Sequence, residues 1–430
     1  MLHIRFIRDN VDLIRKNLER RRNKTKLEEF DRLLELDEKV RKLKKEIQDL
    51  RTQRNSLSRE VGKLKKEGSD ASEVMKQAEK VNKKIATIET ETGNLESELK
   101  RIQMGIPNIL HESVPYGADD EDNEVVKEWG GKPEFEFEVQ SHVDLLESLD
   151  IGDISSAAKI AGSRFYYLKN ELVMLDIAMQ QMALEMLIKK EYTPLYPPFM
   201  MRRAPYEGVT DLADFEDVMY KIEGEDLYLI ATSEHPMVAM HMDDIFEPAD
   251  LPIKLAGIST CFRKEAGSHG KDTKGIFRVH QFSKVEQFVF SLPEESWKIH
   301  EELIKNEEEF IQALKLPYRV VNVCTGDIGI VAAKKYDLEL WMPGQQKYRE
   351  GGSCSNCTAY QATRLNIKYR LKKGGTEKDY LHTLNSTIVA NPRTMVAILE
   401  VYQQDDGSVK IPQALHKYLP SSMKEIVPKN

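Results

Sequence analysis

The 430-residue sequence predicts an α+β protein in which an N-terminal antiparallel helical hairpin precedes a larger domain of strands and helices. Three observations lead to this prediction. Hydrophobic residues recur every three or four positions along two stretches of equal length, which a short turn separates. Charged and aromatic residues alternate along two extended segments between 261 and 290. An acidic segment with glycine and proline separates these regions and marks a domain boundary.

Composition narrows the functional classes. At pH 7 the chain carries a formal net charge of -8, so any nucleic-acid-binding surface has to be local. The sequence shows no signal peptide and no apolar run of membrane length, so we expect a cytoplasmic protein with no membrane partner. Cys354 and Cys357 form a CxxC pair, but no second pair and no nearby histidine pair accompanies it. Buried thiols are therefore favoured over a zinc or redox site.

Residues 1–108 predict a helical coiled-coil arm. A short helix with Val11, Ile14 and Leu18 on one side comes first, and the turn at 67–70 separates two heptad seams. At 1.5 Å per residue, each arm of the hairpin extends at least about 45 Å. The first seam comprises Leu33, Leu36, Val40, Leu43, Ile47, Leu50, Arg54, Leu57, Val61 and Leu64, and the second comprises Ala71, Val74, Ala78, Val81, Ile85, Ile88, Thr92, Leu95, Leu99 and Ile102.

The first helix of this hairpin is basic although the whole chain is acidic. One interpretation is an ordinary solvated coiled-coil surface. The other is an arm that follows a phosphate backbone and recognises RNA by its shape. The residues alone leave both open. The cations are Lys39, Arg41, Lys42, Lys44, Lys45, Arg51, Arg54, Arg59, Lys63, Lys65 and Lys66.

Residues 109–135 predict an acidic linker, and residues 136–430 predict the second domain. A long helix is expected at 171–190. It is apolar on more than one face, which favours burial in an interface as well as in a core. An extended segment with prolines follows at 192–198, and an amphipathic helix is expected at 296–314. Tyr336, Leu338 and Leu340 alternate with Asp337, Glu339 and Trp341, which predicts a half-buried strand with the second set on its outer face.

Two strands joined by a long basic loop, AGSHGKDTKG, are predicted between 261 and 290. The first strand is expected to end near Glu265 and the second to begin near Ile276. Arg263 and Glu265 share a face of the first strand with Cys261. Facing rows of this kind predict a site for a planar anionic ligand with a cation or hydroxyl, such as a nucleotide plus an amino acid. A solvated face of salt bridges is the alternative. The row on the second strand comprises Arg278, His280, Phe282, Lys284 and Glu286.

Two further segments carry polar residues that could belong to a binding site. Thr232, Ser233 and Glu234 end a predicted strand, where such a triplet often serves only as a turn or a helix cap. Pro392 precedes an apolar helical run and suits the first turn of a helix. Arg393 would then lie at a helix N-terminus and face an anion.

These segments carry a family resemblance. Phe262-Arg263-Lys264-Glu265 resembles motif 2 of the class II aminoacyl-tRNA synthetases, and RVHQFSKVEQF at 278–288 is similar to the seryl-tRNA synthetases in particular. The helix at 171–190 and the segment after it resemble motif 1, the dimerisation element. LNSTIVANPR at 384–393 resembles motif 3 in its archaeal and eukaryotic form.

The resemblance implies a fold and an activity. The fold would be a tRNA-binding coiled-coil arm on a class II catalytic domain, which has a mixed, mainly antiparallel sheet with flanking helices and forms a homodimer. The activity would be that of a serine–tRNA ligase, which uses ATP and Mg²⁺ to activate L-serine to seryl-adenylate. The seryl group then passes to the tRNA for serine, and members of the family also charge the tRNA for selenocysteine.

The resemblance also implies residue roles. Arg263 would clamp the α-phosphate and the substrate carboxylate, and Arg393 would close the opposite side as the second catalytic arginine. Glu286 and Thr387 would hold the serine side chain and, with Thr232, Ser233 and Glu234, its amino group. Glu265 and Phe282 would bind adenine, Arg278 the γ-phosphate, and Glu350 and Ser353 both ATP and Mg²⁺. The remaining ATP-binding positions are Lys264, Val279, Gly351 and Gly352.

One departure from the family pattern concerns the metal position. An aliphatic residue usually follows the glutamate that corresponds to Glu350, whereas Gly351 and Gly352 follow it here. Adjacent glycines lose more conformational entropy when they become ordered, which puts the rigidity of this part of the site in question.

Two other classes of function remain as alternatives. A ligase that activates an amino acid for a non-tRNA acceptor would lack a full arm, so the two complete seams weigh against it. A non-catalytic RNA-binding scaffold would not need the charged residues of the second domain, which weigh against that class. These residues are Arg263, Glu265, Glu286, Glu350 and Arg393.

Overall fold

The computed structural model describes residues 1–210, 218–265, 272 and 274–429. They divide into two compact units, Leu2–Pro107 and Asn108–Asn430 together with Met1. Most of the predicted basic loop after Glu265, namely 266–271 and 273, lies outside the described residues.

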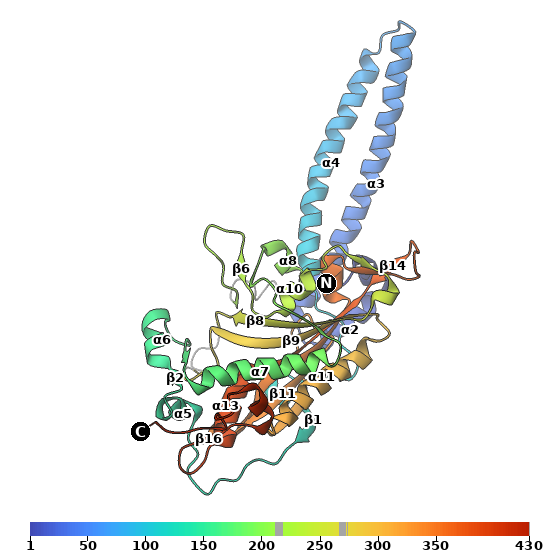
Figure 1. The fold of residues 1–430 in the computed structure, drawn as a ribbon. Helices are drawn as coiled ribbons and strands as arrows, with labels where there is room; N and C mark the ends of the chain where they lie inside the picture. The colour runs from blue at the N-terminus through green and yellow to red at the C-terminus, as the bar shows by residue number, and fades with distance from the viewer. Residues whose placement is uncertain (211–217, 266–271, 273, 430) are drawn as a thin grey trace. The chain divides into compact units, whose positions relative to one another are not determined.

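The N-terminal unit is a helical hairpin preceded by two short helices (Figure 1). Every residue of the two predicted seams is buried or partly buried, which confirms the antiparallel coiled coil. Gly68, at φ +70°, and the side chain of Asp70, which accepts a hydrogen bond from Ser72 N at 2.9 Å, form the turn between the long helices. The helices are α1 (Ile4–Asp9), α2 (Val11–Arg20), α3 (Lys24–Lys66) and α4 (Ser72–Gly105).

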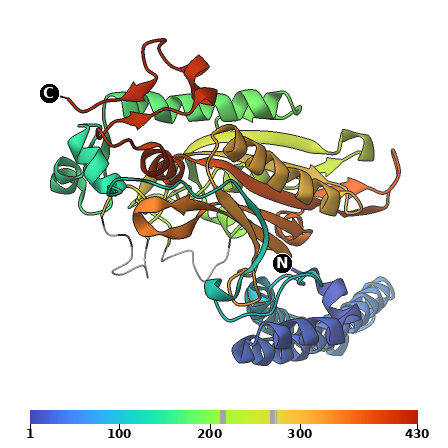
Figure 2. The ribbon, with the colours of Figure 1, turned by 90° about the horizontal axis from the view of Figure 1, so that it is seen from below.

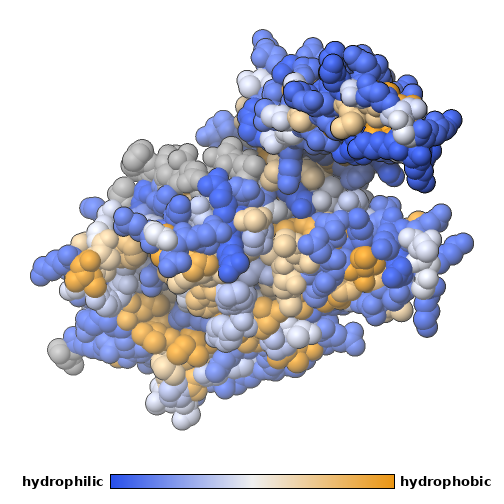
Figure 3. Space-filling view, turned by 90° about the horizontal axis from the view of Figure 1, so that it is seen from above, coloured by the Kyte–Doolittle hydropathy of each residue, from blue (hydrophilic) through white to orange (hydrophobic). Residues whose placement is uncertain are grey.

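The long helices differ in length although the predicted seams are equal. At 1.5 Å per residue, the 43 residues of α3 span about 64 Å and the 34 residues of α4 about 51 Å. The excess of α3 lies before Leu33, where the chain is already helical from Lys24. Most of the hairpin surface that is visible in Figure 3, at the upper right, is hydrophilic, with some apolar residues among the polar ones.

The described part of the second unit is built on an eight-stranded sheet in the order β1-β10-β11-β12-β15-β9-β8-β4. Every neighbouring pair is antiparallel except β4 and β8, which run parallel, so the predicted mixed, mainly antiparallel sheet is confirmed. The strands are β1 (Glu124–Trp129), β4 (Thr193–Leu195), β8 (Ile253–Phe262), β9 (Gln281–Ser291), β10 (Tyr318–Asn322), β11 (Lys334–Met342), β12 (Lys347–Thr358) and β15 (His382–Ala390).

Helices cover the two faces of this sheet unequally. The long helices α7 (Glu171–Ile188), α11 (Ser296–Ala313) and α13 (Asn391–Tyr402) lie on one face (Figure 2), where they pack on residues such as Val285 and Val289 of β9. The short helices α8 (Arg203–Glu207), α10 (Glu234–Ala239) and α12 (Tyr360–Leu365) pack with Phe288 and Phe290 on the other face. Since strand residues alternate, the even-numbered side chains of β9 point away from α7, α11 and α13.

Three expectations need correction. The segment 109–135 is more than a linker, because β1 pairs with β10 and covers what would otherwise be an unpaired sheet edge. Strand β9 begins at Gln281 rather than near Ile276, so Arg278 lies in the connection before it. Strand β11 is buried on both faces, since Asp337 and Trp341 on its supposed outer face are also buried.

The remaining elements lie around the sheet. They include the smaller strands β2 (Gly152–Asp153), β3 (Tyr167–Leu168), β5 (Met200–Met201), β6 (Tyr228–Leu229), β7 (Ile245–Phe246), β13 (Lys368–Arg370), β14 (Lys378–Tyr380), β16 (Val409–Lys410) and β17 (Glu425–Ile426), the helices α5 (His142–Ser148) and α6 (Ile154–Ala161), and the 3₁₀ turns η1 (Asp120–Asp122), η2 (Pro248–Asp250), η3 (Pro343–Gln345) and η4 (Gln413–Tyr418). None of the described helices is both long and apolar enough to cross a membrane.

Candidate active site

A polar cavity of about 120 Å³ lies on the sheet face that the three long helices leave open. Strands β9, β12 and β15 form its floor, and the chain after β8 and before α10 forms its sides. A second cavity of about 500 Å³ shares four of its residues, namely Phe277, Arg278, Glu350 and Arg393. The first cavity is lined by Thr232, Glu234, Arg263, Glu265, Phe277, Arg278, Val279, Phe282, Lys284, Glu286, Glu350, Gly351, Gly352, Ser353, Asn385, Thr387, Ala390, Pro392 and Arg393.

The inner end of the cavity contains a buried ion pair. Lys284 Nζ lies 2.5 Å from Glu286 Oε2 and donates a hydrogen bond to Thr232 Oγ1 at 2.7 Å. Thr387 Oγ1 donates to the same Glu286 oxygen at 3.2 Å, because β9 and β15 place these two residues directly opposite each other. Glu286 is 2% and Lys284 5% exposed. Two opposite charges and two hydroxyls therefore converge where little water enters.

Glu234 adds a second carboxyl group to this end. It is partly buried at the start of α10, and Gln361 Nε2 donates to its Oε1 at 2.7 Å. Burial, and next the negative charge of Glu286, raise the pKa of Glu234 to about 7. This carboxyl group is thus poised to change its charge near neutral pH when a cation binds beside it.

The outer end of the cavity combines arginines with aromatic rings. The guanidinium of Arg263 lies 5.2 Å from the centre of the Phe282 ring, and Arg263 Nε donates to the carbonyl of Ala231 at 3.4 Å. Arg278 Nη1 donates to Glu265 Oε2 at 2.8 Å, which orients both side chains along one wall. A flat, electron-rich ligand could therefore stack on Phe282 while its negative groups meet guanidinium donors.

The opposite wall is formed by the start of α13 and by β12. Arg393 follows Pro392 in the first turn of α13, and its guanidinium lies 3.3 Å from Glu350 Oε2. This positive charge holds the pKa of Glu350 below its ordinary value.

Asp337, opposite Ser353 in the β11–β12 pair, is buried, and burial raises the pKa of its carboxyl to about 7. Asp337 Oδ1 has no hydrogen-bond partner among the described residues.

The two glycines after Glu350 have a clear steric reason. Both belong to β12, a central strand, where Gly352 is paired with Leu338 of β11 and Gly351 lies at an irregularity in the register. A Cβ at position 352 would clash with the carboxylate of Glu307, which lies behind the sheet on α11 and accepts a hydrogen bond from Ser386 Oγ at 3.2 Å. Glycine is therefore needed at 352 because the space of a side chain is already filled.

Comparisons with known proteins decide the family. The protein family described as "Seryl-tRNA synthetase N-terminal domain" matches residues 1–110. The family described as "tRNA synthetase class II core domain (G, H, P, S and T)" matches residues 218–402. A serine–tRNA ligase of Methanospirillum hungatei JF-1 is 54% identical over 419 residues, which cover 97% of this chain and 99% of that protein. The chain belongs to the seryl-tRNA synthetase family. This confirms the predicted family and the predicted class of enzyme, an aminoacyl-tRNA ligase.

Solved structures of seryl-tRNA synthetases agree with this assignment. The crystal structure of the enzyme from Pyrococcus horikoshii in complex with ATP matches with a TM-score of 0.93 at 49% identity, and the match covers 100% of both chains. A cytoplasmic serine–tRNA ligase from Naegleria fowleri in complex with AMP matches with a TM-score of 0.86 at 38% identity, over 98% of this chain and 96% of that one.

Most of the predicted site residues line the cavity, but two do not. Ser233 does not line the cavity; it is fully buried, and its hydroxyl donates to the carbonyl of Gly257 on β8 at 3.3 Å. Lys264 lies outside the lining residues, and its backbone N–H donates to the carbonyl of Val218 at 2.9 Å. The functional roles of the residues that do line the cavity stay predictions.

Five lining residues had no predicted role in the site, namely Phe277, Lys284, Asn385, Ala390 and Pro392. Lys284 could have been found, since it lies between Phe282 and Glu286 on the face that the alternation identifies. Phe277 precedes β9, where no periodicity is available, and Asn385 reaches the cavity only through the pairing of β15 with β12.

Proposed function

We propose that this seryl-tRNA synthetase activates L-serine with ATP to form seryl-adenylate and pyrophosphate, and then transfers the seryl group to the tRNA for serine in the cytoplasm. One observation carries the choice of substrate. The cavity ends in a buried Glu286–Lys284 pair with the hydroxyls of Thr387 and Thr232, so it suits a small amino acid with a hydroxyl side chain. A large apolar side chain would leave these groups unpaired.

In this proposal the serine hydroxyl binds Glu286 and Thr387, and the serine ammonium faces the carboxyl of Glu234 beside Thr232. The serine carboxylate is directed toward Arg263 at the boundary between the inner and outer ends of the cavity. Each charged group of the substrate thereby meets a group of opposite charge or a hydrogen-bond partner. The carboxylate is then the nucleophile in this proposal, and it needs no activation by a general base.

The outer end of the cavity would hold ATP. Adenine stacks on Phe282 with Glu265 at its edge, and Arg263 contacts the α-phosphate, while Arg278 contacts the γ-phosphate and Arg393 closes the other side. Attack by the serine carboxylate on the α-phosphorus forms a phosphorus–oxygen bond and releases pyrophosphate. The arginines stabilise the charge that develops on the phosphate oxygens, so catalysis is largely positioning and electrostatics.

The residues fit Mg²⁺ as part of this site. Magnesium prefers oxygen ligands and usually takes one or two carboxylates together with substrate phosphates. Glu350, whose carboxylate keeps its charge beside Arg393, and the Ser353 hydroxyl would hold the ion. The unpartnered Oδ1 of Asp337 opposite Ser353 is a third oxygen in the same region. Magnesium would neutralise phosphate charge and orient the leaving pyrophosphate.

The coiled coil of residues 1–108 would bind the tRNA. Lys45, Arg59 and Lys66 are exposed, and none of them makes an ion pair within the described chain. Their spacing of 14 and 7 residues puts them at one heptad position, and therefore on one stripe of α3. Such a stripe suits a phosphate backbone. The tRNA for selenocysteine is included in the proposal as a second acceptor.

A homodimer is also part of the proposal. Helix α7 and the segment after it expose apolar side chains, with Ile177 at 42%, Ile188 at 51% and Tyr196 at 72%. Exposed apolar side chains gathered on one long helix and the segment after it suit burial against a second copy of the chain. Sedimentation equilibrium of the full chain would test it, and Ile177→Asp should shift the protein toward the monomer.

Serine-dependent ATP–pyrophosphate exchange tests the activation step. We expect exchange with serine, and with alanine a rate lower by about 10⁴-fold, because alanine would leave Glu286 and Thr387 unpaired. Charging of total tRNA with labelled serine then tests the transfer step. Exchange without charging would favour the ligase for another acceptor. Tight RNA binding with no exchange would favour the non-catalytic scaffold.

A further inference from the structure

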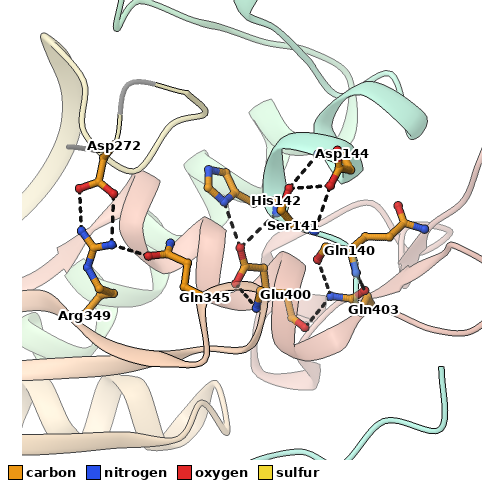
Figure 4. Close-up of polar contacts among 10 residues, drawn as sticks. Gln140, Ser141, His142, Asp144, Asp272, Gln345, Arg349, Glu400 and Gln403 are labelled. Atoms are coloured by element: carbon orange, nitrogen blue, oxygen red, sulfur yellow. Dashed lines mark hydrogen bonds and ion pairs between the residues drawn. The ribbon is translucent and has the colours of Figure 1, made fainter. Parts of the chain in front are cut away.

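A buried carboxylate outside the cavity joins three elements of the second unit. Glu400, in the last turn of α13, is 0% exposed. Its Oε1 accepts hydrogen bonds from the backbone N of His142 at 3.1 Å and from His142 Nδ1 at 3.0 Å, and its Oε2 accepts one from Gly344 N at 2.9 Å (Figure 4). We call Glu400, His142 and Gly344 the Glu400 cluster. It ties α13 to the start of α5 and to the turn η3.

Burying the Glu400 carboxylate would destabilise the folded protein without these hydrogen bonds. Burial of a carboxylate is strongly unfavourable without donors, and a negative charge in the last turn of a helix also opposes the helix dipole. Among the described residues, no lysine or arginine forms an ion pair with Glu400. The three N–H groups therefore offset part of the desolvation, and they fix α13 against the start of α5 and against η3.

On one side, the cluster reaches the wall of the nucleotide end of the cavity. His142 Nε2 is buried without a hydrogen-bond partner among the described residues, and it points at Gly275. A Cβ at Gly275 would clash with this nitrogen, and the backbone there has φ +79°. The chain leads directly from Gly275 to Phe277, whose ring lies 4.1 Å from the guanidinium of Arg349 and 5.2 Å from that of Arg393. The position of the His142 ring thus limits where Phe277 can lie.

On the other side, the cluster reaches Arg349. Gly344 is followed by Gln345, whose side chain accepts a hydrogen bond from Arg349. Arg349 in turn donates to both carboxylate oxygens of Asp272, at 3.1 Å and 2.6 Å. Figure 4 shows both sets of contacts, the Asp272–Arg349–Gln345 chain and the Glu400 cluster. Arg349, Asp272 and Phe277 all line the larger cavity beside Arg393.

We propose that Glu400 and His142 are positioning residues for the nucleotide. They hold the backbone at Gly275 and the turn at Gly344, and through these they place Phe277 and Arg349 against the phosphate-binding arginines. The inference rests on the proposed ATP site. Neither residue lines the cavity, so each acts only through others. The serine end depends on β9 and β15 instead, and the cluster makes no contact with Glu286 or Thr387.

The test is a set of full-length variants in pyrophosphate exchange. Glu400→Gln should raise the KM for ATP by about tenfold, because its amide group would face N–H groups and leave a buried donor unpaired. The KM for serine should stay within about twofold. Glu308→Gln is the control, since Glu308 is also a buried acid, accepts a hydrogen bond from Tyr318 at 2.7 Å and pairs with Lys127 at 2.6 Å, but lines neither cavity. The control should lower stability and leave both KM values unchanged.

A double-mutant cycle tests the contact between His142 and Gly275. Gly275→Ala should raise the KM for ATP strongly in the wild-type background, because its Cβ would clash with the His142 ring. In the His142→Ala background the same change should cost several-fold less, since only the strain of the positive φ remains. Strictly additive effects, or KM values for ATP and serine that rise together, would overturn the inference.

The proposed function and the inference fail in different ways. If wild-type protein shows no serine-dependent exchange, the proposed function is wrong. In that case ATP binding measured by calorimetry without serine still tests the cluster, because Glu400→Gln should weaken ATP binding about tenfold while Glu308→Gln should not. Equal ATP affinity of wild type and Glu400→Gln in that measurement would refute the positioning role.

Discussion

The stripe of unpaired cations on α3 gives the prediction that best separates an RNA-binding arm from a solvated surface. Lys45, Arg59 and Lys66 carry no ion pair within the described chain and share one heptad position. We expect the triple substitution to glutamine to weaken tRNA binding while leaving serine-dependent pyrophosphate exchange unchanged. The substitutions change surface residues only, so the buried seam of the hairpin is preserved.

The magnitude follows from counterion release. Each phosphate contact contributes about 0.7 to 0.9 to the slope of log K against log salt. If all three cations contact phosphates, the slope should fall by about 2 to 3. At about 0.15 M salt this corresponds to a loss of roughly 10²-fold in affinity. The assay is tRNA binding measured at several salt concentrations, followed by charging at subsaturating tRNA.

A matched control uses cations that the protein already neutralises. Lys39, Lys44 and Arg51 each pair with a glutamate of α4, at 2.7, 2.5 and 2.7 Å. Their triple substitution to glutamine changes the net charge by the same amount but removes fewer phosphate contacts, so the slope should change less. Such exposed pairs contribute at most about 1 kcal/mol each to stability. If both triple variants shift the slope equally, or if neither shifts it, the stripe does not contact tRNA.

Four further predictions concern the cavity. Arg393→Ala should cost about 2 to 4 kcal/mol of transition-state stabilisation in pyrophosphate exchange, because it removes a donor aimed at developing phosphate charge; near wild-type exchange would rule this role out. Glu286→Ala should abolish serine activation and leave ATP binding, measured by calorimetry, nearly intact. The pKa of Glu234 is raised to about 7 by burial and by Glu286, and the serine ammonium favours the ionised form. The KM for serine should therefore rise about tenfold per pH unit below 7 and level off above it, and Glu234→Gln should remove this dependence. Glu350→Gln should raise the Mg²⁺ concentration needed for half-maximal exchange, and an unchanged requirement would place the metal elsewhere.

Local periodicity made the arm predictable. The heptad repeat follows from the geometry of a single helix. Leu33 and Ile102 could therefore be assigned to a buried face without knowledge of the partner helix. Alternation along β9 similarly placed Phe282, Lys284 and Glu286 on one face. Such patterns depend only on the geometry of a single element, and that is why they can be read from sequence.

Contacts between distant segments could not be predicted in this way. Strand β1 looked like a linker because its edge position leaves most of its side chains exposed, and only its pairing with β10 makes it part of the sheet. Asp337 looked like an exposed position on an alternating strand, yet it is buried beside a polar cavity. In both cases the neighbouring residues belong to segments that lie far away in sequence, so no local sequence pattern predicts the contact.

Helix α13 illustrates how the two kinds of information combine. Pro392 and the apolar run after it indicate a helix that begins beside Arg393, and the structure has α13 at Asn391–Tyr402. Glu400 lies seven residues after Arg393, which is about 10 Å along the axis and only about 20° short of two full turns. One side of a single rigid helix therefore carries the arginine proposed for the phosphates and the carboxylate that fixes η3 and His142. Any change that rotates or shifts α13 must therefore move Arg393 and Glu400 together. Through Glu400, such a change would also move His142 and Gly344, so the position of Arg393 is coupled to that of Phe277 and Arg349 in the proposed nucleotide site.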